Sequence, residues 1–401
     1  MKKVLLICLV LLILSLAFTS CEILDMFTGE NEIPIDHAHE FGEWVFVTEP
    51  TEHKEGLKER VCSCGEKETE TVRKESSSLS YRFNDTDNTY TLIGIGACTD
   101  TEIIIPKNHY GRPVIAISDQ AFAECRDITS IVIPDGVTTI GANAFICCEN
   151  LTSVTIPDSV TIIGAGTFWN CTSLISITIP DSVTSIGAEA FAGCESLTSV
   201  TIGNNVTSIG EGAFIRCTSL TSVTIGNNIT SIGEGAFVMC ESLTSITIPA
   251  GVTYIGIIPF AVCPSLTEIT VDANNQYYKS VDGNLYTKDG KTLIQYAAGK
   301  TASEFTIPDG VTSIGYGAFA YCESLTSVTL PDSITSIGES AFEECRSLTS
   351  ITIPDSVTTI GGYAFFGCES LTIFCEAESQ PEGWYSRWNE SNCPVEWGYK
   401  G

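Results

Sequence analysis

The sequence is poor in basic residues. Of its 401 residues, 20 are Lys or Arg and 49 are Asp or Glu, which gives a formal net charge of −29. Between Arg126 and Lys279 the only basic residue is Arg216. A surface of this sign repels phosphate backbones, so we expect no nucleic-acid partner.

The sequence also lacks the residues that catalysis needs. Its histidines are His37, His39, His53 and His109, so none falls among the repeats described below. Nucleophilic catalysis requires a base within hydrogen-bonding reach of the nucleophile. No Gly-x-Ser-x-Gly elbow, phosphate-binding glycine loop or His-Glu-x-x-His motif is present. We therefore expect a protein that is not an enzyme.

Long apolar runs are absent apart from one at the start of the chain. Residues 4–18 are almost wholly apolar and follow two lysines, which is typical of a secretory signal too short to span a bilayer. The stretch that ends at Cys21 resembles the bacterial lipobox, so we predict a signal peptide at 1–20, lipidation of Cys21 and an acidic linker at 21–36. These features favour an extracytoplasmic lipoprotein, anchored to a membrane at the bacterial cell surface. A plain secretory signal is the alternative.

A 23-residue repeat dominates the rest of the chain. Phenylalanine recurs at this interval, and cysteine follows each phenylalanine by three residues. The phenylalanines are Phe122, Phe145, Phe168, Phe191, Phe214, Phe237, Phe260, Phe319, Phe342 and Phe365. One repeat cannot bury its own apolar side, whereas stacked repeats can, so the pattern predicts a solenoid in which each coil contacts its neighbours.

Each segment of the repeat has an expected conformation. Val154 and Ile156 alternate with threonine, which predicts a short strand with one buried side. We expect Gly164 to supply a backbone angle that other residues resist. Residues 165–171 predict a short helical or turn-like return with phenylalanine and cysteine facing inward. The fold class is therefore an α/β repeat solenoid with short parallel strands.

These repeats resemble the BspA-like, or treponemal-type, leucine-rich repeats of bacterial surface proteins. The resemblance implies a right-handed superhelix or horseshoe with an N-terminal cap at 79–102, an array at 103–371 and a C-terminal cap at 372–401. It also implies binding or adhesion to proteins or glycans at a cell or host surface. The alternative is a structural spacer or an envelope-protective protein without a specific ligand.

An insertion interrupts the array at 272–304. Asp-Gly pairs between alternating apolar segments predict β-hairpin turns there. Four tyrosines, Tyr277, Tyr278, Tyr286 and Tyr296, cluster in this segment. The insertion is either part of a binding surface or a purely structural spacer.

The cysteines have two expected roles. Those of the repeats occupy an apolar, inward slot, so we expect buried thiols, with some pairing as the alternative. In the C-terminal cap, Cys375 and Cys393 are candidates for a disulfide, and two separately buried thiols are the alternative.

Residues 37–75 form a separate unit, for which we predict a small N-terminal β module. It resembles a short module of bacterial surface proteins that contains His, Trp and a cysteine pair. His39, His53, Cys62 and Cys64 could supply the four ligands of a zinc site. A small β-hairpin stalk without metal is the alternative, and we expect no other cofactor.

The residues beside the repeated phenylalanine and cysteine vary most from copy to copy. They include side-chain types that are enriched in interface cores. The candidate binding residues are Trp169, Arg216, Met239, Tyr321 and Phe366. Filling of local gaps is the alternative role for each. The strand threonines, by contrast, are nearly identical in every copy and offer little that could recognise one particular ligand.

Overall fold

The computed structural model describes residues 41–48, 56–63, 65–72 and 75–401. The chain forms two compact units, Met1–Lys74 and Glu75–Gly401. The predicted signal peptide, Cys21 and the acidic linker lie outside the described residues, as do His39, His53 and Cys64 of the zinc prediction. Within the described ranges no helix has the length and apolarity needed to cross a membrane.

The described part of the first unit is a three-stranded antiparallel sheet. Its strands are β1 (Val45–Thr48), β2 (Gly56–Val61) and β3 (Lys67–Val72), in the order β1-β2-β3. Ion pairs link β2 to β3, with Lys58 Nζ lying 2.9 Å from Glu70 and Lys67 Nζ lying 2.9 Å from Glu59. Opposite charges on facing positions therefore support the pairing of strands that have little apolar surface.

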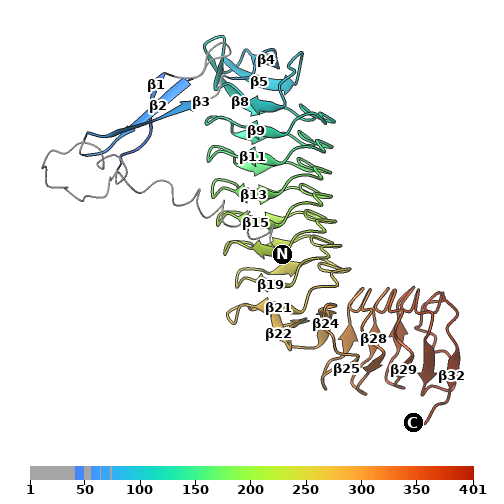
Figure 1. Ribbon diagram of the computed structural model, residues 1–401. Helices are drawn as coiled ribbons and strands as arrows, with labels where there is room; N and C mark the ends of the chain where they lie inside the picture. Colours follow the sequence, from blue (N-terminus) through green and yellow to red (C-terminus); the bar gives the residue numbers. More distant parts are fainter. Residues whose placement is uncertain (1–40, 49–55, 64, 73–74) are drawn as a thin grey trace, which may run out of the picture. The chain divides into compact units, whose positions relative to one another are not determined.

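The second unit is a solenoid built from two columns of parallel strands (Figure 1). The first column comprises β6 (Glu102–Ile104), β9 (Ser130–Val132), β11 (Ser153–Thr155), β13 (Ser176–Ile179), β15 (Ser199–Ile202), β17 (Ser222–Thr224), β19 (Ser245–Ile248), β21 (Glu268–Val271), β25 (Glu304–Thr306), β27 (Ser327–Thr329), β29 (Ser350–Ile353), β31 (Thr372–Cys375) and β32 (Val395–Trp397). The second comprises β8 (Arg112–Ile117), β10 (Thr139–Ile140), β12 (Ile162–Ile163), β14 (Ser185–Ile186), β16 (Ser208–Ile209), β18 (Ser231–Ile232), β20 (Tyr254–Ile255), β24 (Thr292–Gln295), β26 (Ser313–Ile314), β28 (Ser336–Ile337) and β30 (Thr359–Ile360).

Neighbouring coils pair in the register that the repeat dictates. Val154 of β11 pairs with Ile131 of β9, and Ile163 of β12 pairs with Ile186 of β14. Identical positions of successive coils therefore lie one above the other. The predicted solenoid of parallel strands is confirmed, and the expected right-handed superhelix stays a prediction.

The repeated phenylalanines form two buried columns of rings, one from Phe122 to Phe260 and one from Phe319 to Phe365. The rings of Phe168 and Phe191 stack with their centroids 5.3 Å apart, and those of Phe191 and Phe214 with theirs 5.2 Å apart. All ten of these side chains are fully buried. Leucine, isoleucine and valine side chains of the two strand columns complete the core. Burial of these groups, repeated in each coil, is the main force that stabilises the stack.

The return segments are turns, so the α/β assignment is wrong for the part of the chain that the structure describes, which contains no helix. Two residues four positions apart adopt a left-handed conformation in each return, for example Gly166 (φ 58°) and Asn170 (φ 57°). Alternate amides then point at the next coil. Phe168 N donates to Ala190 O, whereas Trp169 N donates to Gly166 O of its own turn. A right-handed helix needs every amide to bond within the segment, which the left-handed residues prevent.

Glycine follows every second-column strand except β8 and β24, and it serves close packing. The predicted role of Gly164, to supply an unusual backbone angle, was wrong. Gly164 is outside the left-handed region of φ, and a Cβ placed on it would lie 3.0 Å from Ala142 N of the preceding coil. A Cβ on Gly187 would lie 2.5 Å from Ala165 N. The glycine column thus lets successive backbones approach more closely than any side chain allows.

The insertion divides the solenoid into two stretches. It forms a hairpin of β22 (Tyr278–Val281) and β23 (Asn284–Thr287), and β23 also pairs with β24. The second-column sheet ends at β20, where the Tyr278 hydroxyl accepts a hydrogen bond from Ile255 N at 2.9 Å. A new sheet starts from the hairpin, and the buried core separates into two clusters at the same place.

Tyr296 takes the place of phenylalanine at the start of the second stretch. Its ring is buried 5.3 Å from that of Phe319, in the slot that phenylalanine fills elsewhere. Tyr286 is buried as well, whereas Tyr277 is 53% exposed. Two of the four clustered tyrosines are therefore core residues, which favours the structural role of the insertion over the binding role.

The return side of the insertion coil is shortened. Tyr296 comes three positions after the strand residue Leu293, whereas Phe319 comes five positions after the equivalent Ile314. As a result, the return turn before the insertion coil comes close to the return turn after it. The Ile258 side chain of the first lies so near Gly317 of the second that a Cβ on this glycine would be 2.6 Å from Ile258 Cγ2. Material is added on the strand side and removed on the return side, so the solenoid bends toward its return turns (Figure 1).

The ends of the array are covered by additional elements. At the N-terminal end β4 (Ser80–Asn84) pairs with β5 (Thr89–Gly94), which pairs with β8. The second partner of β8 in this cap is β7 (Asn108–His109). At the C-terminal end Trp388 packs edge-on against Phe365, the last phenylalanine of the column.

The disulfide expected between Cys375 and Cys393 is not formed, and both are buried free thiols. Cys375 lies in β31 opposite Trp397, whereas Cys393 precedes β32 by two residues, so the two are out of register. The Cys393 thiol instead donates to Cys368 O at 3.4 Å.

Candidate binding surface on the return turns

The five candidate binding residues all lie in return turns, which we define as the segment from the residue after the second-column glycine to the repeated cysteine of each coil, such as 165–171. Trp169 and Phe366 follow the buried phenylalanine directly and are 38% and 40% exposed. The same position holds buried alanine in other coils, for example Ala192 and Ala320. Trp169 and Phe366 are therefore the two aromatic residues of a column that holds alanine, aliphatic residues or glutamate in the other coils.

Arg216, Met239 and Tyr321 occupy the next column, directly before the repeated cysteine. Their φ angles are 61°, 59° and 60°, all in the left-handed region. Glycine stands at this position in other coils, as Gly193 and Gly367. A side chain in this conformation costs about 1–2 kcal/mol. Sequence reasoning identified the variable column but could not detect this backbone strain, which often marks functional positions.

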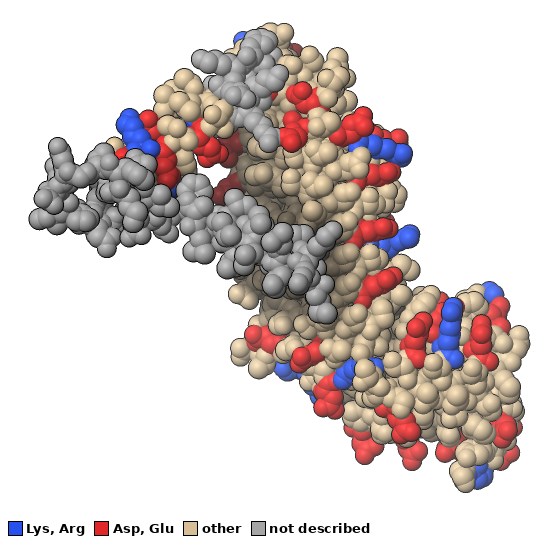
Figure 2. All heavy atoms as spheres, in the orientation of Figure 1, with Lys and Arg blue, Asp and Glu red and all other residues tan. Residues whose placement is uncertain are grey.

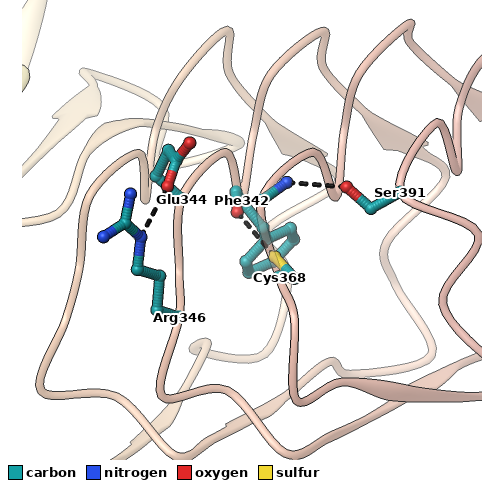
Figure 3. Close-up of polar contacts among 6 residues, drawn as sticks. Phe342, Glu344, Arg346, Cys368 and Ser391 are labelled. Atoms are coloured by element: carbon teal, nitrogen blue, oxygen red, sulfur yellow. Dashed lines mark hydrogen bonds and ion pairs between the residues drawn. The ribbon is translucent and has the colours of Figure 1, made fainter.

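The surroundings of Tyr321 are strongly acidic. Partial burial raises the pKa of its hydroxyl, and the nearby carboxylates of Glu343 and Glu344 raise it further. Arg346 acts in the opposite direction and forms an ion pair with Glu344, with Nε 2.7 Å from the carboxylate (Figure 3). The tyrosine thus keeps its proton and can donate a hydrogen bond.

Charged residues gather on the return turns, and others line the opposite edge of the second stretch (Figure 2). The glutamates of the return turns are Glu124, Glu189, Glu211, Glu234, Glu339, Glu343 and Glu344, and five more directly follow the repeated cysteine, namely Glu149, Glu195, Glu241, Glu323 and Glu369. The strand side instead exposes a row of near-identical threonines. They are Thr155, Thr178, Thr201, Thr224 and Thr247. From β9 to β19 the strands of the first column are therefore uniform and uncharged, whereas the return turns are varied and acidic.

The bend brings the return turns of the two stretches toward each other. Partial burial raises the pKa of the Tyr316 hydroxyl, and the charges of Glu339 and Glu343 from the second stretch and of Glu234 from the first raise it further. Figure 1 shows the turns of both stretches on the inner side of the bend. A partner seated there would meet side chains that are distant in the sequence.

The repeated cysteines serve the core, and the expectation of buried thiols holds. Each thiol from Cys148 to Cys263 donates to the carbonyl of the phenylalanine 26 residues earlier, as Cys194 does to Phe168 O at 3.2 Å. Burial raises the pKa of Cys194 to about 12. A thiol held in its neutral form is a poor nucleophile and a poor metal ligand.

The zinc prediction stays a prediction, because His39, His53 and Cys64 lie outside the described residues. Cys62 is buried and follows β2. Within the ranges that the structure describes, no group of three His, Cys, Asp or Glu side chains could hold a metal ion.

The comparisons with known proteins agree with this architecture. The family model described as "BspA type Leucine rich repeat region" matches in six copies, at residues 97–194, 162–281 and 296–379. These matches span more than half of the chain. This chain belongs to the BspA-type leucine-rich repeat family. A search of curated proteins gives no significant match to this BspA-type chain.

Solved structures of bacterial leucine-rich repeat proteins are similar to the BspA-type chain. A leucine-rich cell surface protein of Faecalibacterium prausnitzii is 37% identical with a TM-score of 0.67, over 81% of this chain and 94% of that one. A leucine-rich repeat protein of Bacteroides ovatus is 28% identical with a TM-score of 0.52, over 80% and 98%. The pneumococcal vaccine antigen PcpA is 19% identical with a TM-score of 0.56, over 75% and 80%, which shows a shared fold.

Proposed function

We propose that this protein binds a partner protein at a bacterial cell surface through the return turns on the inner side of its bend. The observation that carries the proposal is the placement of Trp169, Arg216, Met239, Tyr321 and Phe366. These residues fall in two adjacent columns of one face, on both sides of the insertion. Aromatic, arginine and methionine side chains at such positions are typical of interface cores.

The two faces of the solenoid differ in their capacity for specific recognition. The strand face repeats one hydroxyl pattern and would offer a ligand the same contact in every coil. The return face changes from coil to coil, and three of its candidates hold strained backbone conformations. Variation and retained strain together support binding at the return face.

The cell-surface location rests on the N-terminal sequence and on the F. prausnitzii relative, which is described as a cell surface protein. In this proposal Cys21 carries the lipid anchor, and the bound protein belongs to the host matrix or to another cell, so that the function is adhesion. A glycan ligand and a spacer role without a ligand are the competing functions.

Binding to immobilised matrix proteins tests the proposal. We expect saturable binding by the wild-type protein, and a dissociation constant at least about tenfold higher for the double variant Trp169→Ala, Tyr321→Ala, because hot-spot side chains carry most of the binding energy. The matched control is Thr201→Ala, Thr224→Ala, which alters the strand face and should bind as wild type does. Equal affinity of the first variant would exclude the return-face site, and absence of saturable binding would favour the spacer.

A further inference from the structure

The N-terminal cap carries a cluster of aromatic side chains, two exposed and two half-buried, that is not part of the repeated phenylalanine columns. Phe83 of β4 and Tyr90 of β5 face each other across the strand pair, with ring centroids 5.2 Å apart. The His109 ring of β7 lies 4.8 Å from the Tyr90 ring. Tyr110, in the turn between β7 and β8, lies 4.4 Å from His109 and 6.5 Å from Tyr90. We name Phe83, Tyr90, His109 and Tyr110 the cap cluster.

Tyr110 occupies a position that folding alone does not explain. It and Gly111 have φ angles of 46° and 73°, so this two-residue turn needs left-handed backbone at both positions. Such turns strongly favour Asn-Gly, because asparagine tolerates this conformation and a bulky side chain is strained in it. The Tyr110 side chain is also 84% exposed, so little burial offsets the strain. A strained residue whose side chain faces solvent is a functional candidate.

The cap cluster combines ring faces with polar groups. Phe83 is 39% exposed, and the guanidinium of Arg112 lies 5.1 Å from its ring centroid. Asp85 follows β4 directly and is exposed. The cluster therefore combines exposed ring surface with a guanidinium that lies over the Phe83 ring and with a carboxylate two residues from Phe83 in the sequence.

The size and chemistry of the cluster identify its ligand class. A stable protein interface buries about 800 Å² on each partner, far more than these few rings can offer. A sugar ring is small, and it has an apolar C–H face with hydroxyls at its rim. We propose that the cap cluster is a carbohydrate-binding site, in which Tyr110 and Phe83 stack on sugar rings and Arg112 and Asp85 bind hydroxyl groups. This site is separate from the return turns and does not depend on their function.

Saturation-transfer NMR and calorimetry with cellotetraose, chitotetraose, mannotetraose and N-acetyllactosamine test the proposal on the intact protein. We expect at least one of these probes to bind with a dissociation constant on the order of 1 mM or tighter. The Tyr110→Asn variant should lose at least about tenfold in affinity, since it removes the stacking ring. Asparagine suits the turn, so its midpoint of thermal unfolding should be equal to or above that of wild type.

Tyr277→Ala is the matched control, because Tyr277 is an exposed tyrosine of the insertion and should not affect sugar binding. Phe83→Ala is a second test at the other end of the cluster and should also weaken binding. The proposal is overturned if none of the four sugars binds at about 10 mM, roughly ten times the expected dissociation constant. It is also overturned if Tyr110→Asn and Phe83→Ala both bind sugar as tightly as Tyr277→Ala does.

Discussion

At the scale of single residues, each column of the repeat has one physical requirement. Phenylalanine fills the core, cysteine donates to a backbone carbonyl, and glycine permits contact between backbones. Because the same position contacts its equivalents in the coils above and below, one requirement is imposed on every copy. This explains why the framework residues vary so little within the chain while the exposed neighbours vary freely.

Gly187→Ala is expected to destabilise the protein by about 1–3 kcal/mol, the range for overpacking a rigid site. The new Cβ would lie 2.5 Å from Ala165 N and 2.6 Å from Gly164 C, both backbone atoms of the preceding coil. Urea unfolding followed by circular dichroism measures the change. Ser185→Ala, two residues earlier on the same strand, is the control and should change the free energy of unfolding little. A Gly187→Ala protein as stable as this control would show that the coils are less closely packed.

At the scale of elements, the insertion coil combines a hairpin with a shortened return. It interrupts both strand columns, and within it Tyr296 occupies the phenylalanine position next to Phe319. A tyrosine in a phenylalanine slot carries a hydroxyl into the core. Among the described residues no group pairs with the Tyr296 hydroxyl, and burial raises its pKa to about 12.

Tyr296→Phe should therefore stabilise the protein by about 1 kcal/mol, because it removes a buried polar group without a hydrogen-bond partner and keeps the ring. Tyr296→Ala should cost about 3–5 kcal/mol through the cavity that it leaves. Chemical denaturation measures both changes. A Tyr296→Phe protein that is clearly less stable than wild type would mean that the hydroxyl has a partner, such as bound water.

At the scale of the whole molecule, the buried thiols act together on stability. A thiol whose pKa is raised on folding must be neutral in the folded state, whereas it ionises near its ordinary value of 9.0 once unfolded. The stability that this contributes is complete below pH 9 and is lost as pH rises toward the folded-state pKa. That value is about 12 for Cys148, Cys194 and Cys263.

We therefore expect the free energy of unfolding to fall steeply above pH 9. Each such thiol contributes about 1.4 kcal/mol per pH unit in this range. Thermal unfolding from pH 7 to pH 11 measures how the free energy of unfolding changes with pH. The Cys194→Ala variant should lose the contribution of one thiol, so its free energy of unfolding should fall less steeply above pH 9. If stability were flat over this range, the thiols would not be buried as the structure describes.

The sequence by itself determined the solenoid, its 23-residue coil, the in-register strands and the buried phenylalanines and thiols. It could do so because each of these features depends on contacts between identical positions, and periodicity reveals such contacts directly. The same reasoning selected Trp169, Arg216 and Tyr321, since variation within a repeat is visible in one chain.

Only the tertiary structure decided the rest. The return segments are turns because of backbone angles that asparagine, arginine or tyrosine adopts in place of glycine, which no composition rule specifies. The direction of the bend follows from a return that is two residues shorter than its neighbours, and it places the turns of both stretches on one inner side. In the N-terminal cap, the hairpin of β4 and β5 and the turn after β7 bring Phe83, Tyr90 and Tyr110 together. Periodicity cannot report contacts that occur only once.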